Sequence, residues 1–522
     1  VTMYFYSKGK EATDMGYMRT ITVCITQNHP LFDYAETVTR LANHLSNAIR
    51  FRQRQVLTAV SKPATNWSAN EQEVMKEILD TISQMKRPVS VPTKENHFLG
   101  YSFLDSVMKY TKNPDYYAKG LPRQTAQYVL KQAVRDMKTF YASCHAYAKD
   151  PSAFTGKPKL PGYKKKGGHT TATVSNQDCI IKLRNGKWYA EFPFIKEMPV
   201  CIGFPIPDAR LKQACIIPEN GRYRLTFQFE VEKDLPEHSK ESHRICAIDF
   251  GVDNLMAVTN NCGIASLLYK GGPAKASNQW YNKTIAKLVS EQTLQTGKKF
   301  IPDETYYAIT NRRNDQVSDY LHKCAKHFVT WCVENRIDTV VMGVNKYWKQ
   351  NSGIGHQNNQ EFVQLPITKL REIIQYLCEW NGIRCIEQEE SYTSKASFPD
   401  HDPIPVYRKE DSTKYTFSGK RKPTHYAGMY KKDGFRGLYK TPNGTIINSD
   451  LNGSANILRK AYPQAFDGES LPCFENVFII LHPDYENQKK NRQKQLQAKN
   501  SFSKSKEKRQ RRKECAFRQT VA

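Results

Sequence analysis

Three acidic positions, far apart in the sequence, have the residue types and surroundings of a metal-dependent hydrolase. The first is Asp249, which directly follows the uncharged run 245–248 (ICAI). Such a run is typical of a buried central strand, and a strand of this kind does not continue into a carboxylate unless the carboxylate is paired or holds a metal. On its own, Asp249 could also cap a turn or pair with a lysine.

The second and third positions follow other predicted elements. Asp450 stands where a short strand leads into a helix within 445–460, and the small residues 453–455 (GSA) would let that helix lie close to a sheet. Glu389 and Glu390 stand at the end of a predicted strand, 383–389. Taken singly, an acid at a helix start is often only a cap, and adjacent glutamates at a strand end often face solvent.

Taken together, these acids predict phosphodiester hydrolysis. In-line attack by water on a phosphodiester uses two divalent cations about 4 Å apart, bridged by carboxylates. Mg²⁺ prefers oxygen ligands and keeps several of its waters, so three acids suffice, with Mn²⁺ as an alternative ion. No histidine or cysteine ligand is required.

A single predicted sheet could bring the three positions together. From residue 243 onward the predicted order is three strands, a helical segment, a strand, an amphipathic helix and a strand. The segments are 245–248, 254–258, 263–269, 275–336, 337–344, 367–380 and 383–389. This is the order of a ribonuclease H-like sheet, which places clustered acids at its strand ends.

The chain before residue 243 predicts a helical lobe beside a small β domain. A strand at 20–26 is followed by helical spacing at 33–61, 70–88, 100–112 and 122–149. From 170 to 232 the hydrophobic period changes to two, with Asn-Gly turn signals at 185–186 and 220–221. We expect a small sheet or barrel made of 20–32 and 170–235, and barrels of this kind often bind oligonucleotides.

Between the lobe and the β domain lies a lysine-rich loop, 158–168 (PKLPGYKKKGG). Lys164, Lys165 and Lys166 follow Tyr163 on a segment whose prolines end the preceding helix. The run is either a solvated surface or a contact with a phosphate backbone.

The composition favours a polyanionic partner. The formal net charge is +27 and the sequence pI about 9.4, which favours nucleic acid. The 13 cysteines contain no CxxC pair, which argues against a disulfide scaffold and for a reducing, intracellular setting. No apolar run is long enough for a membrane helix, so we expect a soluble protein without a membrane partner. The basic tail, 484–522, is expected to be a disordered nucleic-acid arm or a nuclear import signal.

Several motifs give the chain a resemblance to the TnpB family of transposon-encoded, RNA-guided DNA endonucleases, whose relatives include Fanzor and the type V CRISPR effectors. AIDFGVDNLMAVTNN resembles the family's first RuvC motif, with Asp249 as its acid, and DLNGSANILRK resembles the third, with Asp450. GVNKYWKQNSG, NNQEFVQLPITKLREIIQY, EESYTSKASF and PKLPGYKKK resemble further family segments. The resemblance covers about residues 120–460.

Two departures from the family pattern concern the metal sites. Where the family's second RuvC motif has a glutamate, this chain has Gly343, and the branch that it resembles supplies the acid from the later strand. Adjacent strand residues face opposite ways, so only one of Glu389 and Glu390 should reach the metals. Glu390 is preferred, with Glu389 as the alternate. Segment 391–448 lacks the cysteines of a zinc ribbon, and His401 and His425 lack zinc-ligand spacing, so no zinc is predicted.

The resemblance implies a multidomain α+β and α/β fold. It comprises a flexible N-terminus, 1–19, a wedge-like β-barrel, a helical recognition lobe, 33–169, and a ribonuclease H-like RuvC nuclease domain. The nuclease domain spans 243–483, with a helical insertion at 271–336 and a zinc-free insertion at 391–448.

The implied activity is RNA-guided cleavage of double-stranded DNA beside a short flanking motif, with a guide RNA from the transposon end. The implied catalytic and metal-binding residues are Asp249, Glu390 and Asp450, holding two Mg²⁺ ions. Nucleic acid would contact Lys164, Lys165, Lys166, Lys346, Trp348 and Lys349, although Trp348 could also be a core residue. We expect a monomer in the cytoplasm or nucleoid of a prokaryote, or in the nucleus of a eukaryotic host. Two alternatives stay open: a nuclease-inactive RNA-guided repressor, and a guide-free transposase or resolvase on the same sheet.

Overall fold

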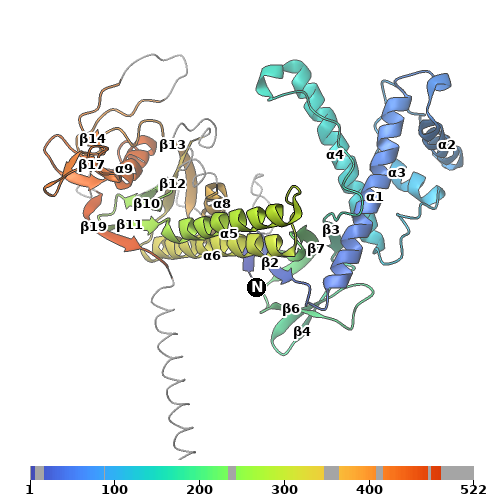
Figure 1. The fold of residues 1–522 in the computed structure, drawn as a ribbon, viewed down its shortest axis with the longest axis horizontal. Helices are drawn as coiled ribbons and strands as arrows, with labels where there is room; N and C mark the ends of the chain where they lie inside the picture. Colours follow the sequence, from blue (N-terminus) through green and yellow to red (C-terminus); the bar gives the residue numbers. More distant parts are fainter. Residues whose placement is uncertain are drawn as a thin grey trace, which may run out of the picture. The chain divides into compact units, whose positions relative to one another are not determined.

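The computed structural model describes residues 2–5, 17–87, 89–232, 243–345, 364–406, 415–467 and 472–483, with backbone only for 2–5. The chain divides into two compact units, 1–233 and 234–522 (Figure 1). The basic tail, most of the predicted N-terminal segment and the predicted contacts Lys346, Trp348 and Lys349 lie outside the described residues.

Helices make up much of the first unit. They are α1 (Phe32–Ala59), α2 (Ala69–Gln84), α3 (Tyr101–Tyr110) and α4 (Arg123–Lys149), with short 3₁₀ turns at Ala64–Asn66 and Pro151–Ala153. Capping chemistry explains where α2 begins, since the Ser68 hydroxyl accepts from the Glu71 amide while the Glu71 carboxylate accepts from the Ser68 amide. On α1, Val38, Leu45 and Ile49 form part of a fully buried stripe at helical spacing.

The strands of the first unit form two open sheets, so the predicted closed barrel is wrong for the described residues. The strands are β1 (Thr2–Phe5), β2 (Tyr17–Ile25), β3 (Ala172–Ser175), β4 (Ile180–Arg184), β5 (Lys187–Glu191), β6 (Val200–Gly203), β7 (Ala209–Glu219) and β8 (Arg222–Val231). One sheet has the order β1-β2-β8-β7-β3 and the other β4-β5-β6. The outer strands β1 and β3 each pair on one side only, which leaves two edges and no closure.

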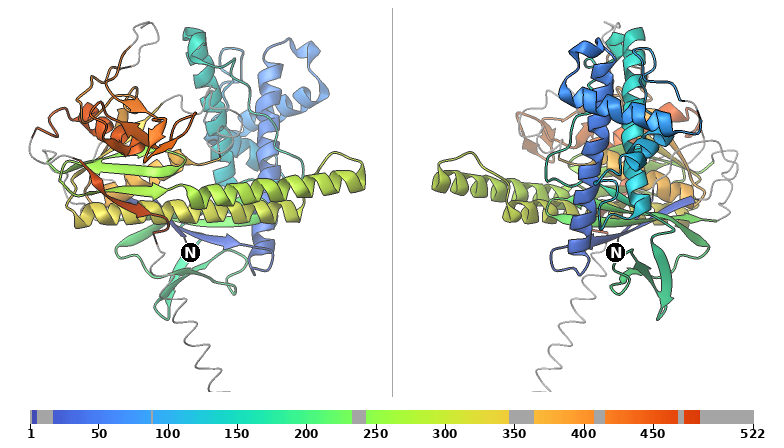
Figure 2. Two further views of the ribbon diagram at one scale, coloured as in Figure 1. Left: turned by 60° about the vertical axis from the view of Figure 1, so that its left-hand side comes forward. Right: turned by 90° about the vertical axis from the view of Figure 1, so that its right-hand side faces the viewer.

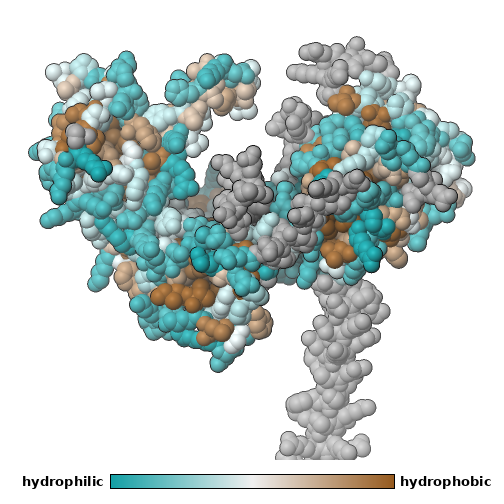
Figure 3. Space-filling model, turned by 180° about the vertical axis from the view of Figure 1, so that it is seen from behind, coloured by the Kyte–Doolittle hydropathy of each residue, from teal (hydrophilic) through white to brown (hydrophobic). Residues whose placement is uncertain are grey.

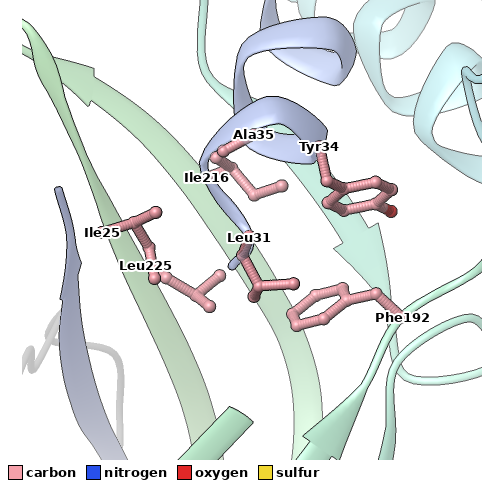
Figure 4. A pocket seen from close by; sticks show the side chains of 7 residues that line it. All are labelled: Ile25, Leu31, Tyr34, Ala35, Phe192, Ile216 and Leu225. Atoms are coloured by element: carbon pink, nitrogen blue, oxygen red, sulfur yellow. The ribbon is translucent and has the colours of Figure 1, made fainter. Parts of the chain in front are cut away.

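The core of the first unit lies where the start of α1 meets the larger sheet. A small cavity there is lined entirely by apolar and aromatic residues: Ile25, Leu31, Tyr34, Ala35, Phe192, Ile216 and Leu225 (Figure 4). The ring centroids of Tyr34 and Phe192 lie 5.8 Å apart. Because the lining offers no convergent polar groups, we interpret the cavity as a packing gap and not as a ligand site.

The second unit is built on one six-stranded mixed sheet. Its strands are β9 (Ile245–Phe250), β10 (Asn254–Asn260), β11 (Ala265–Lys270), β12 (Thr339–Val344), β13 (Arg384–Glu389) and β19 (Cys473–Ile480), in the order β13-β12-β9-β10-β11-β19. Strand β10 runs antiparallel to its neighbours β9 and β11, whereas β12 is parallel to both β9 and β13. The predicted succession of strands and helices is confirmed, and β19, parallel to β11, was not predicted.

Among the described residues, four helices accompany this sheet: α5 (Gly272–Thr296), α6 (Glu304–Glu334), α8 (Ile367–Trp380) and α9 (Ser449–Ala461). Helices α5 and α6 lie side by side as a long hairpin in all views (Figures 1 and 2). The sequence predicted one helical segment at 275–336, but Gly297 ends α5 in a left-handed conformation with φ of 61°.

Helix α9 packs closely on the sheet through small and polar residues, as its sequence predicts. The Ser454 hydroxyl donates to the Ala247 carbonyl at 2.8 Å and accepts from the Thr259 amide at 3.1 Å. On another side of α9, the Asn452 and Asn456 side-chain amides donate to the Ala396 carbonyl at 2.8 and 2.7 Å. All of these polar groups are buried, so the helix is fixed both to the sheet and to the segment that follows β13.

A small module between β13 and α9 completes the described part of the second unit. Its strands are β14 (Lys420–Arg421), β15 (His425–Tyr426), β16 (Met429–Tyr430), β17 (Leu438–Lys440) and β18 (Ile446–Asn448). They form a three-stranded sheet, β14-β17-β18, and a separate β15-β16 hairpin. The buried Tyr439 anchors the module, because its hydroxyl donates to the Lys395 carbonyl at 2.8 Å.

The described surface is mainly hydrophilic. Figure 3 shows hydrophobic residues gathered in separate patches on the face it presents. Among the described residues, no helix combines the length and apolar character that a membrane crossing needs.

Candidate active site

The structure brings Asp249 and Glu390 to the same part of the sheet. Asp249 lies near the end of β9, and Glu390 directly follows β13, with β12 between these two strands. At Gly343 on β12, an added Cβ would lie 2.9 Å from Glu390 Oε2 and 3.2 Å from the Ile248 carbonyl oxygen. The glycine therefore leaves the space that the Glu390 carboxylate uses to reach across β12.

Asp450 joins them from α9. An added Cβ at Gly453, one turn along α9, would overlap Asp249 Oδ2, so the helix backbone approaches the Asp249 carboxylate directly. The cap of α9 is Asn448, whose side-chain oxygen accepts from the amides of Asp450 and Leu451 at 2.9 and 3.2 Å. Asp450 is therefore not the helix cap, and its carboxylate is available for another role.

Electrostatic coupling shows how close the acids are. Burial raises the pKa of Asp249 well above its ordinary value, and the charges of Asp450 and Glu390 raise it further, while Arg421 opposes them. Burial, followed by the charge of Glu389, raises the pKa of Glu390 to about 7, although Arg371 and Lys460 oppose this shift. A carboxyl group whose pKa is raised by burial and by neighbouring acids is typical of functional sites.

Glu389 faces a different environment from its neighbour. Its carboxylate accepts from Lys460 Nζ at 2.7 Å and from the Ser391 amide at 2.7 Å. Partial burial would raise its pKa, but the hydrogen bonds from Lys460 and Ser391 outweigh burial, and the pKa is lowered. The structure thus places Glu390, and not Glu389, beside Asp249.

Polar side chains surround Asp450. Its Oδ2 accepts from Asn254 Nδ2 at 2.7 Å, and its Oδ1 accepts from the Ser449 hydroxyl at 3.2 Å. The Arg421 guanidinium of β14 lies 3.9 Å from Oδ1 and is 43% exposed. A solvent-facing cation therefore stands beside the acids.

Asp249 is the acid whose pKa both of the other carboxylates raise. In the described part of the chain, no three histidine, cysteine, aspartate or glutamate side chains surround one ion position. The donor set still fits Mg²⁺ chemically, because the acids are hard oxygen ligands and Asp249 and Glu390 are partly buried. Two ions shared between pairs of acids would match this arrangement.

The lysine-rich loop is held along α1. Side chains at helical spacing bind its carbonyl oxygens: Asn43 donates to Lys165 at 2.9 Å, Asn47 to Lys164 at 3.1 Å and Arg54 to Pro161 at 3.0 Å. Lys164 turns inward and donates to the Thr170 hydroxyl, and burial lowers its pKa. Lys165 and Lys166 are exposed, so they are the two lysines of the run that face solvent.

Asn254, Lys270 and Arg421 were not identified from the sequence as site residues. Asn254 lies inside the first acidic motif, and its position at the start of β10 could have indicated that it belongs to the site. Lys270 and Arg421 carry no comparable signal, because only strand pairing and packing bring them to the acids.

The two histidines considered as zinc ligands contact aromatic rings. The ring centroids of His401 and Phe398 lie 6.2 Å apart, and those of His425 and Tyr430 4.9 Å apart.

Two family models match adjoining parts of the chain. OrfB_IS605, described as a probable transposase, matches residues 226–349, which include Asp249. The Cas12f1-like TNB domain matches residues 368–457, which include Glu390 and Asp450.

Solved structures and one curated protein also resemble the chain. A Cas12f1–sgRNA–target DNA complex is 12% identical, with a TM-score of 0.40 over 79% of this chain and 82% of that one. Alicyclobacillus acidoterrestris C2c1 with single-guide RNA is 8% identical, with a TM-score of 0.32 over 80% of this chain and 70% of that one. The TnpB-like protein ORF457 of Acidianus two-tailed virus is 24% identical over 246 residues, which are 46% of each chain.

The chain thus matches about half the length of this viral relative. The two adjoining family models and the viral protein agree with the motifs around the three acids, and together they support a TnpB family protein.

Proposed function

We propose that this protein is an RNA-guided DNA endonuclease that hydrolyses phosphodiester bonds at Asp249, Glu390 and Asp450. The observation that carries the proposal is the electrostatic coupling of Asp249 to both of the other acids. Burial and the charges of Asp450 and Glu390 disfavour the ionised form of Asp249 in the empty site, and a bound cation would relieve that cost.

The sheet topology supports a ribonuclease H-like, RuvC-type nuclease domain. Three antiparallel strands are followed by two parallel strands, in the order β11-β10-β9-β12-β13. The acids come from the central strand, from the end of an outer strand and from a helix packed on the sheet. Residues from remote parts of the sequence thereby share one edge of the sheet.

Each residue of the site has a distinct role in the proposed reaction. Asp249, Glu390 and Asp450 would hold two Mg²⁺ or Mn²⁺ ions, which supply an activated water and charge stabilisation at the leaving oxygen. Asn254 holds one oxygen of Asp450 by hydrogen bonding. The exposed guanidinium of Arg421 is placed to bind a phosphate oxygen of the strand that is cut.

The partners in this proposal are a guide RNA and a double-stranded DNA target. The net charge of +27 supports extensive backbone contacts, and the exposed Lys165 and Lys166 offer two of them. The named relatives add to this, since the matched solved complexes contain single-guide RNA or target DNA.

The glycine at position 343 does not favour an inactive protein. The Glu390 carboxylate lies where a side chain at position 343 would begin, so the acid is supplied from a neighbouring strand. We therefore prefer a nuclease over a repressor that binds without cutting.

The test is a cleavage assay on purified complex. The protein is expressed together with the DNA that flanks its gene, and RNA that copurifies is sequenced to define the guide. The complex is then incubated with Mg²⁺ and a library of targets bearing randomised flanking sequence. Guide-dependent cutting that is lost in Asp249→Asn supports the proposal.

Other outcomes would overturn it in different ways. Guide-dependent DNA binding without cutting at any Mg²⁺ or Mn²⁺ concentration would indicate a repressor. Cutting or joining of DNA by protein free of RNA would indicate a transposase or resolvase.

A further inference from the structure

A chain of three polar side chains runs from the end of β11 to Asp450. Lys270 Nζ donates to Asn254 Oδ1 at 2.8 Å, and Asn254 Nδ2 donates to Asp450 Oδ2 at 2.7 Å. Asn254 is 4% exposed, so its amide cannot exchange these partners freely with water.

The chemistry of the first residue fixes the direction of the second. A lysine ammonium group only donates hydrogen bonds, so it requires the oxygen of the Asn254 amide. The amide nitrogen must then point the other way, toward Asp450. Without the lysine, the amide could turn over and present its oxygen to the carboxylate, which would repel it.

Local backbone structure holds Lys270 and Asn254 in place. Asn254 and Lys270 are register partners on β10 and β11, and the pairing shifts between Asn254 and Met256. Bulges of this kind redirect side chains near active sites. The Tyr320 hydroxyl, from α6, donates to the Lys270 carbonyl and so fixes the strand end from which the lysine extends.

We propose that Lys270 is a positioning residue for the divalent-cation site, acting through Asn254 on Asp450. The lysine keeps the asparagine amide in its donor orientation, which holds Asp450 Oδ2 in place and leaves Oδ1 beside Ser449 and Arg421. This inference rests on the proposed function, because it assigns a role toward the cations that Asp450 would hold.

The chain offers a matched control for Lys270. Lys275 lies nearby in the sequence and pairs with Asp253 Oδ1 at 2.7 Å, where the Asp253 side chain is 76% exposed. The same substitution, lysine to methionine, removes a positive charge at either position, but only Lys270 contacts the residue that binds Asp450.

The experiment compares Lys270→Met, Lys270→Arg, Lys275→Met and wild type as intact complexes with their copurified RNA. Binding of Mn²⁺ is measured by electron paramagnetic resonance, and the cleavage rate is measured against Mg²⁺ concentration. Loss of an outer partner of a metal ligand weakens metal binding about 10- to 100-fold, and we expect Lys270→Met to raise the Mn²⁺ dissociation constant and the Mg²⁺ midpoint by that factor. Lys270→Arg restores most of the affinity, and Lys275→Met matches wild type.

A second variant tests the hydrogen-bonded series Lys270–Asn254–Asp450 even if Lys270→Met folds poorly. Asn254→Ala removes the middle residue and produces the same weakening, and adding Lys270→Met to it causes no further loss of Mn²⁺ affinity. If Lys270 and Asn254 acted independently, the double variant would instead lose Mn²⁺ affinity by the product of the two single losses.

The possible failures are distinguishable. If wild type binds Mn²⁺ and cuts DNA while Lys270→Met binds Mn²⁺ equally well, the inference is wrong and the proposed function stands. If wild type neither binds Mn²⁺ nor cuts DNA, both are wrong.

Discussion

Two buried acids of the first unit differ in their environment from the acids of the candidate site in the second unit. In the first unit, Glu71 is paired with Lys62 at 2.8 Å, and the hydrogen bond from Lys62, with others, lowers the pKa of Glu71 to about 2. Glu191 is held by Lys182, which lowers its pKa. In the second unit, burial and neighbouring acids raise the pKa of Asp249 and Glu390.

The difference separates structural acids from functional ones. A buried carboxylate with a strong basic partner contributes to the folded state, whereas ionised acids whose pKa is raised by burial and by neighbouring acids weaken the folded state until a cation arrives. The residue types are the same in both units, so their partners and not their identity mark the candidate site.

The largest expected effect is on the cleavage rate, and it distinguishes the adjacent glutamates Glu389 and Glu390. Glu390→Gln lowers the cleavage rate by about 1,000-fold or more, in the range seen when a transition-state-stabilising group is removed. Glu389→Gln is the matched control, and its rate stays close to wild type because its carboxylate faces Lys460. Single-turnover cleavage measures both variants, and equal losses would contradict the assignment of Glu390.

The next effect concerns a paired acid of the first unit. Arg52 binds Glu77 through two hydrogen bonds of 2.8 Å, and its side chain is 9% exposed. Glu77→Gln leaves the guanidinium partly uncompensated, and we expect a loss of about 3 kcal/mol in the free energy of unfolding. Urea unfolding followed by circular dichroism measures the change. If the free energy of unfolding fell by no more than about 1 kcal/mol, as for an exposed ion pair, the Arg52–Glu77 pair would contribute little to stability.

A smaller effect tests how closely α9 approaches Asp249. Gly453→Ala adds a methyl group that overlaps Asp249 Oδ2, so the carboxylate must move. Displacement of a reacting group by about 1 Å can cost about 100-fold in rate, which sets the expected loss. Thermal unfolding of the variant checks that the fold is retained. An unchanged rate would mean that Asp249 tolerates the displacement.

The smallest effect is a pH dependence of stability without divalent cations. The pKa of Glu390 is raised from 4.5 to about 7, so the folded state binds its proton more tightly than the unfolded state does. The stability that this proton provides is complete below pH 4.5 and is lost as the pH rises to about 7. Melting temperatures measured in EDTA should therefore fall across this window less steeply in Glu390→Gln than in wild type. Added Mg²⁺ should raise the wild-type melting temperature at neutral pH.

Much of the second unit could be predicted from its sequence. Uncharged strands, the amphipathic helix ending before Gly382 and the small residues at 453–455 indicated the order of elements and the close packing of α9. The alternation of side chains along a strand indicated that only one of Glu389 and Glu390 reaches the site, but not which one. These signals are local, and the sequence carries them directly.

The remaining features depend on contacts between distant segments. Whether a two-residue hydrophobic period closes into a barrel depends on how the edge strands pair, and β1 and β3 do not meet in the described structure. Arg421 and Lys270 reach the acids only through the packing of β14 and the register of β11. The inward turn of Lys164 likewise depends on α1, more than 100 residues earlier in the chain.

The pairing of β2 with β8 has a consequence for how the protein is synthesised. About 200 residues separate the two strands, so at usual translation rates of about 5–20 residues per second the ribosome needs about 10–40 s to deliver the partner of β2. During that interval the edge of β2 that later pairs with β8 is unpaired, although the helices α1 to α4 have already been synthesised. Nascent chains stalled before residue 222 should consequently bind chaperones more strongly than chains stalled after the β domain is complete.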